Sequence, residues 1–151
     1  MKPLIVLLTS FVIAIFTVKW VTKQYDVALS ARIAMAIMLC FTAIGHFAFT
    51  KGMSMMLPQF VPFKTSLVYL TGIFEILLAV GLLIPKLQVL SGWALIIFLV
   101  LMLPANIYAA IHQVNYQKGT FDGHGLTYLW FRIPLQVLFI VWAYVSAVKT
   151  F

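Results

Sequence analysis

Residues 71–83 read TGIFEILLAVGLL, a run of apolar side chains interrupted by one carboxylate, that of Glu75. The chain around this run has 151 residues, of which 64% are hydrophobic and only 9% are charged. Soluble domains contain about 45–50% apolar and about 25% charged residues. A chain this apolar cannot cover a water-facing surface with polar groups. The sequence therefore predicts an integral membrane protein of one domain, residues 1–151, with Glu75 inside the bilayer.

The apolar runs have the length of membrane-spanning helices, which need about 20 residues. Pro85 follows one run, and Gly123 and Gly125 precede another, as helix breakers do. A signal peptide is the alternative for the first run. The charged stretch KWVTKQYD, 19–26, separates it from the small-residue site at 28–31, so we expect a retained span. The sequence predicts an all-α protein with five spans, at 3–22, 31–50, 66–84, 88–112 and 126–148.

The net charge of +7 comes from basic residues placed singly at the borders of these runs. Lysines at such borders extend toward lipid headgroups and do not form a basic patch, so we expect no nucleic-acid partner. One side of the membrane carries Lys2, Lys51, Lys64 and Lys118; the side with the C-terminus carries Lys19, Lys23, Arg32, Lys86 and Lys149. Under the positive-inside rule, this excess of one charge favours a cytoplasmic C-terminus, and we expect a bacterial inner membrane.

Ionisable residues inside the spans lie at similar depths from one side of the membrane. At a rise of 1.5 Å per residue, Glu75 is about 13 Å into its helix and His46 about 6 Å. Arg132 and Asn106 are each about 9 Å deep by the same measure, and Gln136 lies one turn beyond Arg132. Four helices thus contribute polar groups to one leaflet. Such groups are costly in a membrane and usually face the protein interior.

The face of the third span that carries Glu75 also carries Thr71, Gly72, Leu78 and Ala79. Small residues at this spacing indicate close contact with another helix. We expect an ion pair between Glu75 and Arg132, because a guanidinium matches a carboxylate with two parallel hydrogen bonds.

Asn106, Gln136 and His46 would satisfy the remaining donors and acceptors. Thr42 and Thr50 lie on the same stripe of their helix as His46. Two interpretations stay open: a structural cluster that fixes helix register, and a pocket that binds a ligand.

Two loops add candidate chemistry. KGMSMMLPQFVPF, 51–63, is too short to span and would form either a lid over the polar cluster or a plain interfacial turn. FDGHG, 121–125, offers Asp122 and His124, which are typical of a glycine turn more than of a metal site, so no metal is expected. No P-loop, GxGxxG or HExxH motif is present. The only cysteine, Cys40, lies in an apolar run and is expected to be buried, and it has no partner for a disulfide.

Five motifs in order resemble the DoxX-like family of small membrane proteins: ARIAMAIMLCFTAIGHF, MLPQFVP, VYLTGIFEILLAVGLLIP, LPANIYAA and FRIPLQVLFIVWA. The resemblance covers about residues 31–145 and implies a four-helix bundle, residues 31–148, preceded here by an additional N-terminal span. The family's pattern is matched at each of the candidate pocket residues, which are His46, Tyr69, Glu75, Asn106, Arg132 and Gln136. It is also matched at Pro58 and Pro62 of the candidate lid loop, whose other candidate residues are Met56 and Phe60.

Members of that family are linked to quinone-coupled sulfur oxidation, to maturation of disulfide-containing enzymes and, in an animal relative, to assembly of nicotinic acetylcholine receptors. The resemblance therefore implies an accessory or assembly protein that engages another membrane protein or a lipid-like molecule. An oxidoreductase subunit with a quinone or lipid in the pocket is the alternative, and a small transporter or proton path comes third. Expected partners are the bilayer, one of these molecules, and further copies of the chain in a homo-oligomer.

Overall fold

The computed structural model describes residues 2–149, and in this range the chain is helical, with one isolated bridge between Asn115 and Thr120. Five helices are long and apolar enough to cross a membrane, which fits an integral membrane protein. The elements are α1 (Lys2–Thr22), α2 (Val27–Ala48), α3 (Thr50–Ser54), α4 (Lys64–Leu83), α5 (Gln88–Ile111), α6 (Thr127–Ala143) and a π-helical turn, η1 (Tyr144–Val148). The predicted all-α architecture is confirmed, and five helices have the length and hydropathy expected of the five predicted spans.

The start of α2 shows how local chemistry sets a boundary that hydropathy does not. This helix begins at Val27, four residues before the predicted span, because Asp26 caps it. The Asp26 carboxylate accepts a hydrogen bond from the Leu29 amide at 2.8 Å, which satisfies one of the free N–H groups at the helix start. The short helix α3 lies in the loop where a lid or a plain turn was expected.

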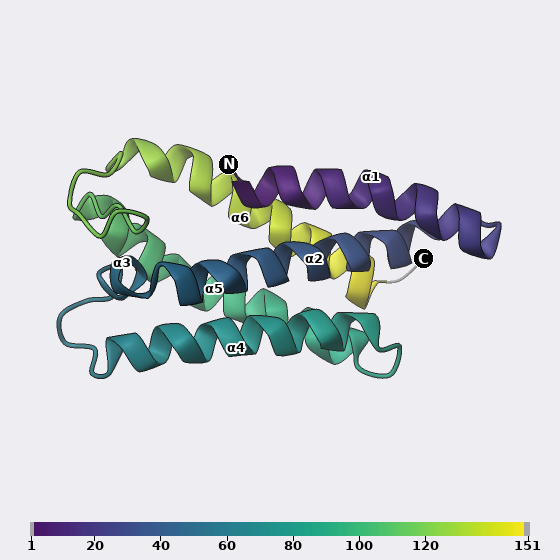
Figure 1. Ribbon diagram of the computed structural model, residues 1–151, viewed down its shortest axis with the longest axis horizontal. Helices are drawn as coiled ribbons and strands as arrows, with labels where there is room; N and C mark the ends of the chain where they lie inside the picture. Colours follow the sequence, from purple (N-terminus) through teal and green to yellow (C-terminus); the bar gives the residue numbers. More distant parts are fainter. Residues whose placement is uncertain (1, 150–151) are drawn as a thin grey trace.

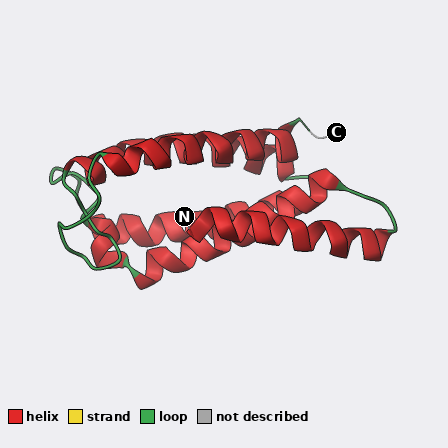
Figure 2. Cartoon of the chain, turned by 90° about the horizontal axis from the view of Figure 1, so that it is seen from above, coloured by secondary structure: helices red, strands yellow, loops and turns green. Residues whose placement is uncertain are grey.

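Helix α2 occupies the centre of the bundle and packs against α1 on one side and α4 on the other (Figure 1). Helix α5 packs against α4 and α6, and α6 reaches α2 mainly through η1. Seen from above, the helices form two layers with loops gathered at the ends (Figure 2). One end of the bundle collects α3, the start of α4 and the loop between α5 and α6 (Figure 1). All the candidate polar residues therefore belong to the halves of their helices nearest this end or to the helix middle.

Small residues set the closest helix contacts. A β-carbon added at Gly72 on α4 would lie 2.9 Å from the His46 β-carbon on α2. A β-carbon at Gly92 on α5 would lie 2.9 Å from that of Ala147 in η1. Glycine at these positions lets the two backbones approach, which is how membrane helices gain packing contact without a hydrophobic driving force. Cys40, expected in the interior, is instead exposed on α2.

Candidate functional site

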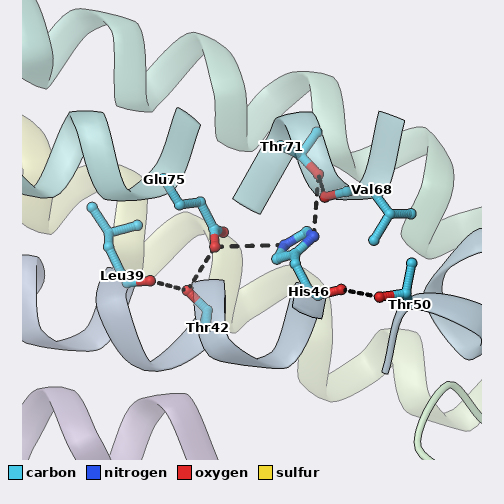
Figure 3. Close-up of polar contacts among 7 residues, drawn as sticks. All are labelled: Leu39, Thr42, His46, Thr50, Val68, Thr71 and Glu75. Atoms are coloured by element: carbon cyan, nitrogen blue, oxygen red, sulfur yellow. Dashed lines mark hydrogen bonds and ion pairs between the residues drawn. The ribbon is translucent and has the colours of Figure 1, made fainter. Parts of the chain in front are cut away.

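The ion pair of Glu75 joins the two most extensively packed helices, α2 and α4 (Figure 3). The Glu75 Oε2 atom lies 3.5 Å from His46 Nε2, and the two side chains are only 8% and 14% exposed. On the other side of the imidazole, His46 Nδ1 lies 3.1 Å from the Thr71 hydroxyl. The Thr42 hydroxyl lies 3.2 Å from Glu75 Oε2 and 3.0 Å from the Leu39 carbonyl oxygen, either of which can accept its one proton. These four side chains form what we call the His46–Glu75 cluster.

The cluster follows directly from spacing along the two helices. Thr42 and His46 are four residues apart on α2, and Thr71 and Glu75 are four residues apart on α4, so each pair occupies one helix face. Gly72 removes the side chain that would hold the faces apart. The prediction that this face of α4 turns inward is confirmed, because Gly72, Glu75, Leu78 and Ala79 are all buried.

The threonine hydroxyls also join the cluster to the backbones of both helices. The Thr71 hydroxyl lies 2.8 Å from the Val68 carbonyl of α4 as well as 3.1 Å from His46 Nδ1. The Thr42 hydroxyl lies 3.0 Å from the Leu39 carbonyl of α2 as well as 3.2 Å from Glu75 Oε2. Each hydroxyl has one proton to donate and two lone pairs that accept, so both can bond to a side chain of the cluster and to a backbone carbonyl group.

The ion pair predicted between Glu75 and Arg132 is not formed. Glu75 pairs with His46 instead, and Arg132 makes no ion pair with any carboxylate among residues 2–149. The reason lies in the helix neighbours: α4 packs against α2, α3 and α5, whereas α6, which carries Arg132, packs mainly against α5 and η1. Two residues at the same depth meet only if their helices are adjacent, and these helices are not.

Asn106 and Gln136 form a second polar contact, between α5 and α6. Both are buried, and the Asn106 amide donates to Gln136 Oε1 at 3.5 Å and to the Met102 carbonyl at 3.1 Å. Gln136 Nε2 in turn donates to the Leu99 carbonyl. The two amides bond to each other and to the α5 backbone around Pro104, which lacks an N–H. No hydrogen bond or ion pair connects these amides with the His46–Glu75 cluster within the described range.

Tyr69 lies outside both polar contacts. Its ring stacks on Phe47 with centroids 5.8 Å apart, and 42% of the residue is exposed. The predicted set of six residues thus separates into His46 with Glu75, Asn106 with Gln136, Tyr69 on the surface, and Arg132 by itself. Thr42 and Thr71 were predicted only to share a helix face with His46 and Glu75, respectively. Each threonine lies four residues before its ionisable neighbour, and this spacing is the signal that could have placed both in the site.

The loop after α2 is anchored at its start and open at its far side. Gly52 of α3 packs directly on the Tyr116 backbone, and the rings of Phe49 and Tyr116 meet edge to face at 6.1 Å. Further along, Phe60 and Phe63 are 85% and 82% exposed. Of the four predicted lid residues, the first two are half-buried and the last two exposed: Met56, Pro58, Phe60 and Pro62.

The loop between α5 and α6 contains one perturbed acid and one perturbed phenol. Burial raises the pKa of Tyr116, the neighbouring Tyr128 raises it further, and the charge of Arg132 lowers it. A hydrogen bond from Thr120 lowers the pKa of Asp122, which is fully exposed. Within residues 2–149, His, Cys, Asp and Glu side chains nowhere gather in a group of three that could hold a metal ion.

Two hollows in the surface lie along α1 and α2. One, of about 530 Å³, is at the turn between these helices, where Thr22 and Asp26 line it. The other, of about 270 Å³, is an apolar groove lined by Ala14 and Val18 of α1 and by Ile37 of α2. Neither is lined by the predicted pocket residues, so a ligand role for those residues stays a prediction.

A family model described as Domain of unknown function (DUF8561) matches residues 35–147. No curated protein and no solved structure matches the chain.

Proposed function

The chain belongs to the DUF8561 family, whose function is unknown, and we propose that it is an integral membrane accessory or assembly protein of the DoxX-like kind. The matched range begins within α2 and includes α4, α5 and α6, the four long helices in which a DoxX-like bundle is expected. The resemblance of its motifs to that family supports an assembly role. On this proposal, the His46–Glu75 cluster fixes the α2–α4 register while the loop after α3 engages another membrane protein.

The observation that carries the proposal is the loop 57–63. Its two phenylalanines are more than four-fifths exposed, while the chain before it is held by the contact of Gly52 with Tyr116. A fixed base with exposed aromatic side chains is what a recognition surface needs, because ordering costs are low and aromatic side chains supply much contact area. Lys64 directly follows the loop and places it at the membrane border.

A photo-crosslinking residue at Phe60 tests this proposal in the native membrane. The matched control is the same residue at Trp20, which is also 85% exposed but lies near the end of α1, at the opposite end of the bundle (Figure 1). We expect a membrane protein to be captured from Phe60 and not from Trp20.

The abundance or maturation of the captured membrane protein should fall when this chain is deleted. Wild type should restore it, and a Phe60→Ser, Phe63→Ser variant should not. The same products from both crosslinking sites, or full rescue by that variant, would contradict the proposal.

A quinone- or lipid-linked oxidoreductase subunit is the second candidate, favoured by the buried contact between the His46 imidazole and the Glu75 carboxyl group. Imidazole and carboxyl groups can pass protons, and a quinone takes up two protons together with two electrons from a separate donor when it is reduced to the quinol. Mass spectrometry of small molecules purified with wild type and with Glu75→Gln tests it. A quinone bound to wild type and lost from the variant would support this function, and no bound quinone in either would contradict it.

A further inference from the structure

Arg132 is a cation within a membrane-spanning helix that has no anionic partner in the described part of the chain. The full sequence contains three carboxylate side chains. Asp26 caps α2, Glu75 pairs with His46, and Asp122 accepts a hydrogen bond from Thr120. All three are therefore engaged elsewhere. A guanidinium stays charged at any physiological pH, so Arg132 cannot escape this situation by losing a proton.

The Arg132 side chain is also short of hydrogen bonds. Its Nε atom is buried and has no hydrogen-bond partner, and no hydrogen bond from its other nitrogens is formed within residues 2–149. Arg32, near the other membrane face, provides the contrast. That side chain has a buried Nε too, but its Nη1 donates to Gln88 on α5. An unsatisfied buried donor is costly, so Arg132 is the position where a ligand acceptor would contribute most.

The depth of Arg132 matches the boundary between lipid headgroups and hydrocarbon. It lies five residues after the start of α6 at Thr127, or about 8 Å along the helix axis. Two residues earlier, Trp130 is 85% exposed, as aromatic residues of the membrane interface are. An arginine at this depth is within reach of a lipid phosphate from the same leaflet.

Tyrosines and lysines lie at the same end of the bundle as Arg132. Tyr128 lies one turn before Arg132 on the same face, and Tyr116 is close enough for the arginine's charge to affect its pKa. The same end of the bundle carries three lysines and one carboxylate outside the spans: Lys51, Lys64, Lys118 and Asp122. Such an excess of positive charge attracts anionic lipids to that leaflet.

We propose that Arg132, with Tyr128 one turn before it on the same helix face, binds the phosphate of an anionic membrane lipid. The planar guanidinium offers two parallel N–H donors to phosphate oxygens, and the bilayer supplies the counter-ion that the chain lacks. The site is separate from the loop 57–63 and does not depend on a protein partner. Either proposal can therefore fail without the other.

Lipid titration of the purified full-length protein in an uncharged detergent tests the proposal. The probes are phosphatidylglycerol, phosphatidylcholine and inorganic phosphate, and the readouts are thermal unfolding and lipid retention by native mass spectrometry. For wild type we expect stabilisation by phosphatidylglycerol well above that by the other two. For Arg132→Gln we expect phosphatidylglycerol affinity to fall by at least about tenfold, which corresponds to about 1.4 kcal/mol.

The matched control is Lys118→Gln, which removes the same charge from the loop at the same end of the bundle. It should lower the affinity less than Arg132→Gln does, because Lys118 adds only general attraction for anionic lipid. Arg132→Lys, which keeps the charge but not the two-pronged geometry, should be weakened more than Lys118→Gln. If Arg132→Gln does not fold, the comparison of Arg132→Lys with Lys118→Gln decides. Equal phosphatidylglycerol binding by all variants, or equal stabilisation by phosphate and lipid, would overturn the proposal.

Discussion

Replacing Glu75 with glutamine tests the His46–Glu75 cluster, because glutamine keeps the shape of the side chain and removes its charge. The Glu75 Oε2 atom contacts both His46 Nε2 and the Thr42 hydroxyl, so the loss of its charge affects two neighbours. At 3.5 Å and an effective dielectric constant of about 20, two unit charges attract by about 5 kcal/mol. The cost of taking both ions out of water offsets much of that attraction.

The net loss expected for Glu75→Gln is about 1.5–3 kcal/mol of the free energy of unfolding, as for a hydrogen bond between charged groups. It is smaller than the about 3–5 kcal/mol seen when a buried pair loses one partner, because a histidine left alone can release its proton. Denaturant unfolding in mixed lipid–detergent micelles measures it for Glu75→Gln, His46→Gln and the double variant. The double variant should lose less than the sum of the two single losses, since both remove one interaction.

The control is Thr50→Ala, one turn beyond His46, whose hydroxyl bonds only to backbone carbonyls of α2. It should leave the coupling between the other two positions unchanged. A loss below about 0.5 kcal/mol for Glu75→Gln would refute the reasoning, because it is within the range of ordinary surface substitutions. Strictly additive single losses would refute it as well, since they would mean that no coupling joins the two side chains.

Three further substitutions test the α2–α4 contact at Gly72, the α5–α6 contact at Gln136 and the environment of Tyr116 in the loop between α5 and α6. Gly72→Ala should lower the free energy of unfolding by about 1–3 kcal/mol, because the added alanine methyl group would lie 2.9 Å from His46 Cβ. The control Gly45→Ala should be tolerated, because its methyl group would meet only a methionine methyl at 3.5 Å. Gln136→Leu should cost about 1–3 kcal/mol in unfolding measurements, because the buried Asn106 amide would lose its Gln136 acceptor and the Leu99 carbonyl its side-chain donor, and an unchanged stability would contradict this. Because the pKa of Tyr116 is raised, its contribution to the free energy of unfolding is complete below its ordinary pKa of 10.0 and is lost as pH rises through the raised value. Ultraviolet titration should show one phenol that ionises at higher pH than an ordinary tyrosine, and Tyr116→Phe should remove it.

The transmembrane architecture could be predicted because it depends on one strong property, the length of apolar runs. The inward face of α4 could be predicted as well, since a helix places residues three and four apart on one side and small residues mark the side that meets another helix. Gly72 and Ala79 are buried with Glu75 for this reason. The start of α2 was predicted less well, because a cap formed by Asp26 extends the helix beyond its apolar run.

The partner of Glu75 could not be predicted from depth. Position along a helix gives the height of a side chain in the membrane, but not which helices are neighbours, and both His46 and Arg132 were available at similar heights. The packing of α4 against α2 decided for His46. Cys40 was misplaced for a related reason: in a membrane both the core and the lipid-facing surface are apolar, so hydrophobicity alone does not separate buried from exposed positions.

Trp142 gives the protein an internal optical reporter of how α1 is seated. Its indole N–H donates to the Ala31 carbonyl of α2 at 3.0 Å, and Phe11 of α1 meets its ring edge to face at 4.9 Å. The other three tryptophans are 48–85% exposed, and the ring contact of Trp93 is with Tyr144 and not with α1. Because near-ultraviolet circular dichroism arises from aromatic rings held in one orientation, the tryptophan band should follow the contact between α1 and the remaining helices. Detachment of α1 could then be recorded in native sequence, without an added label.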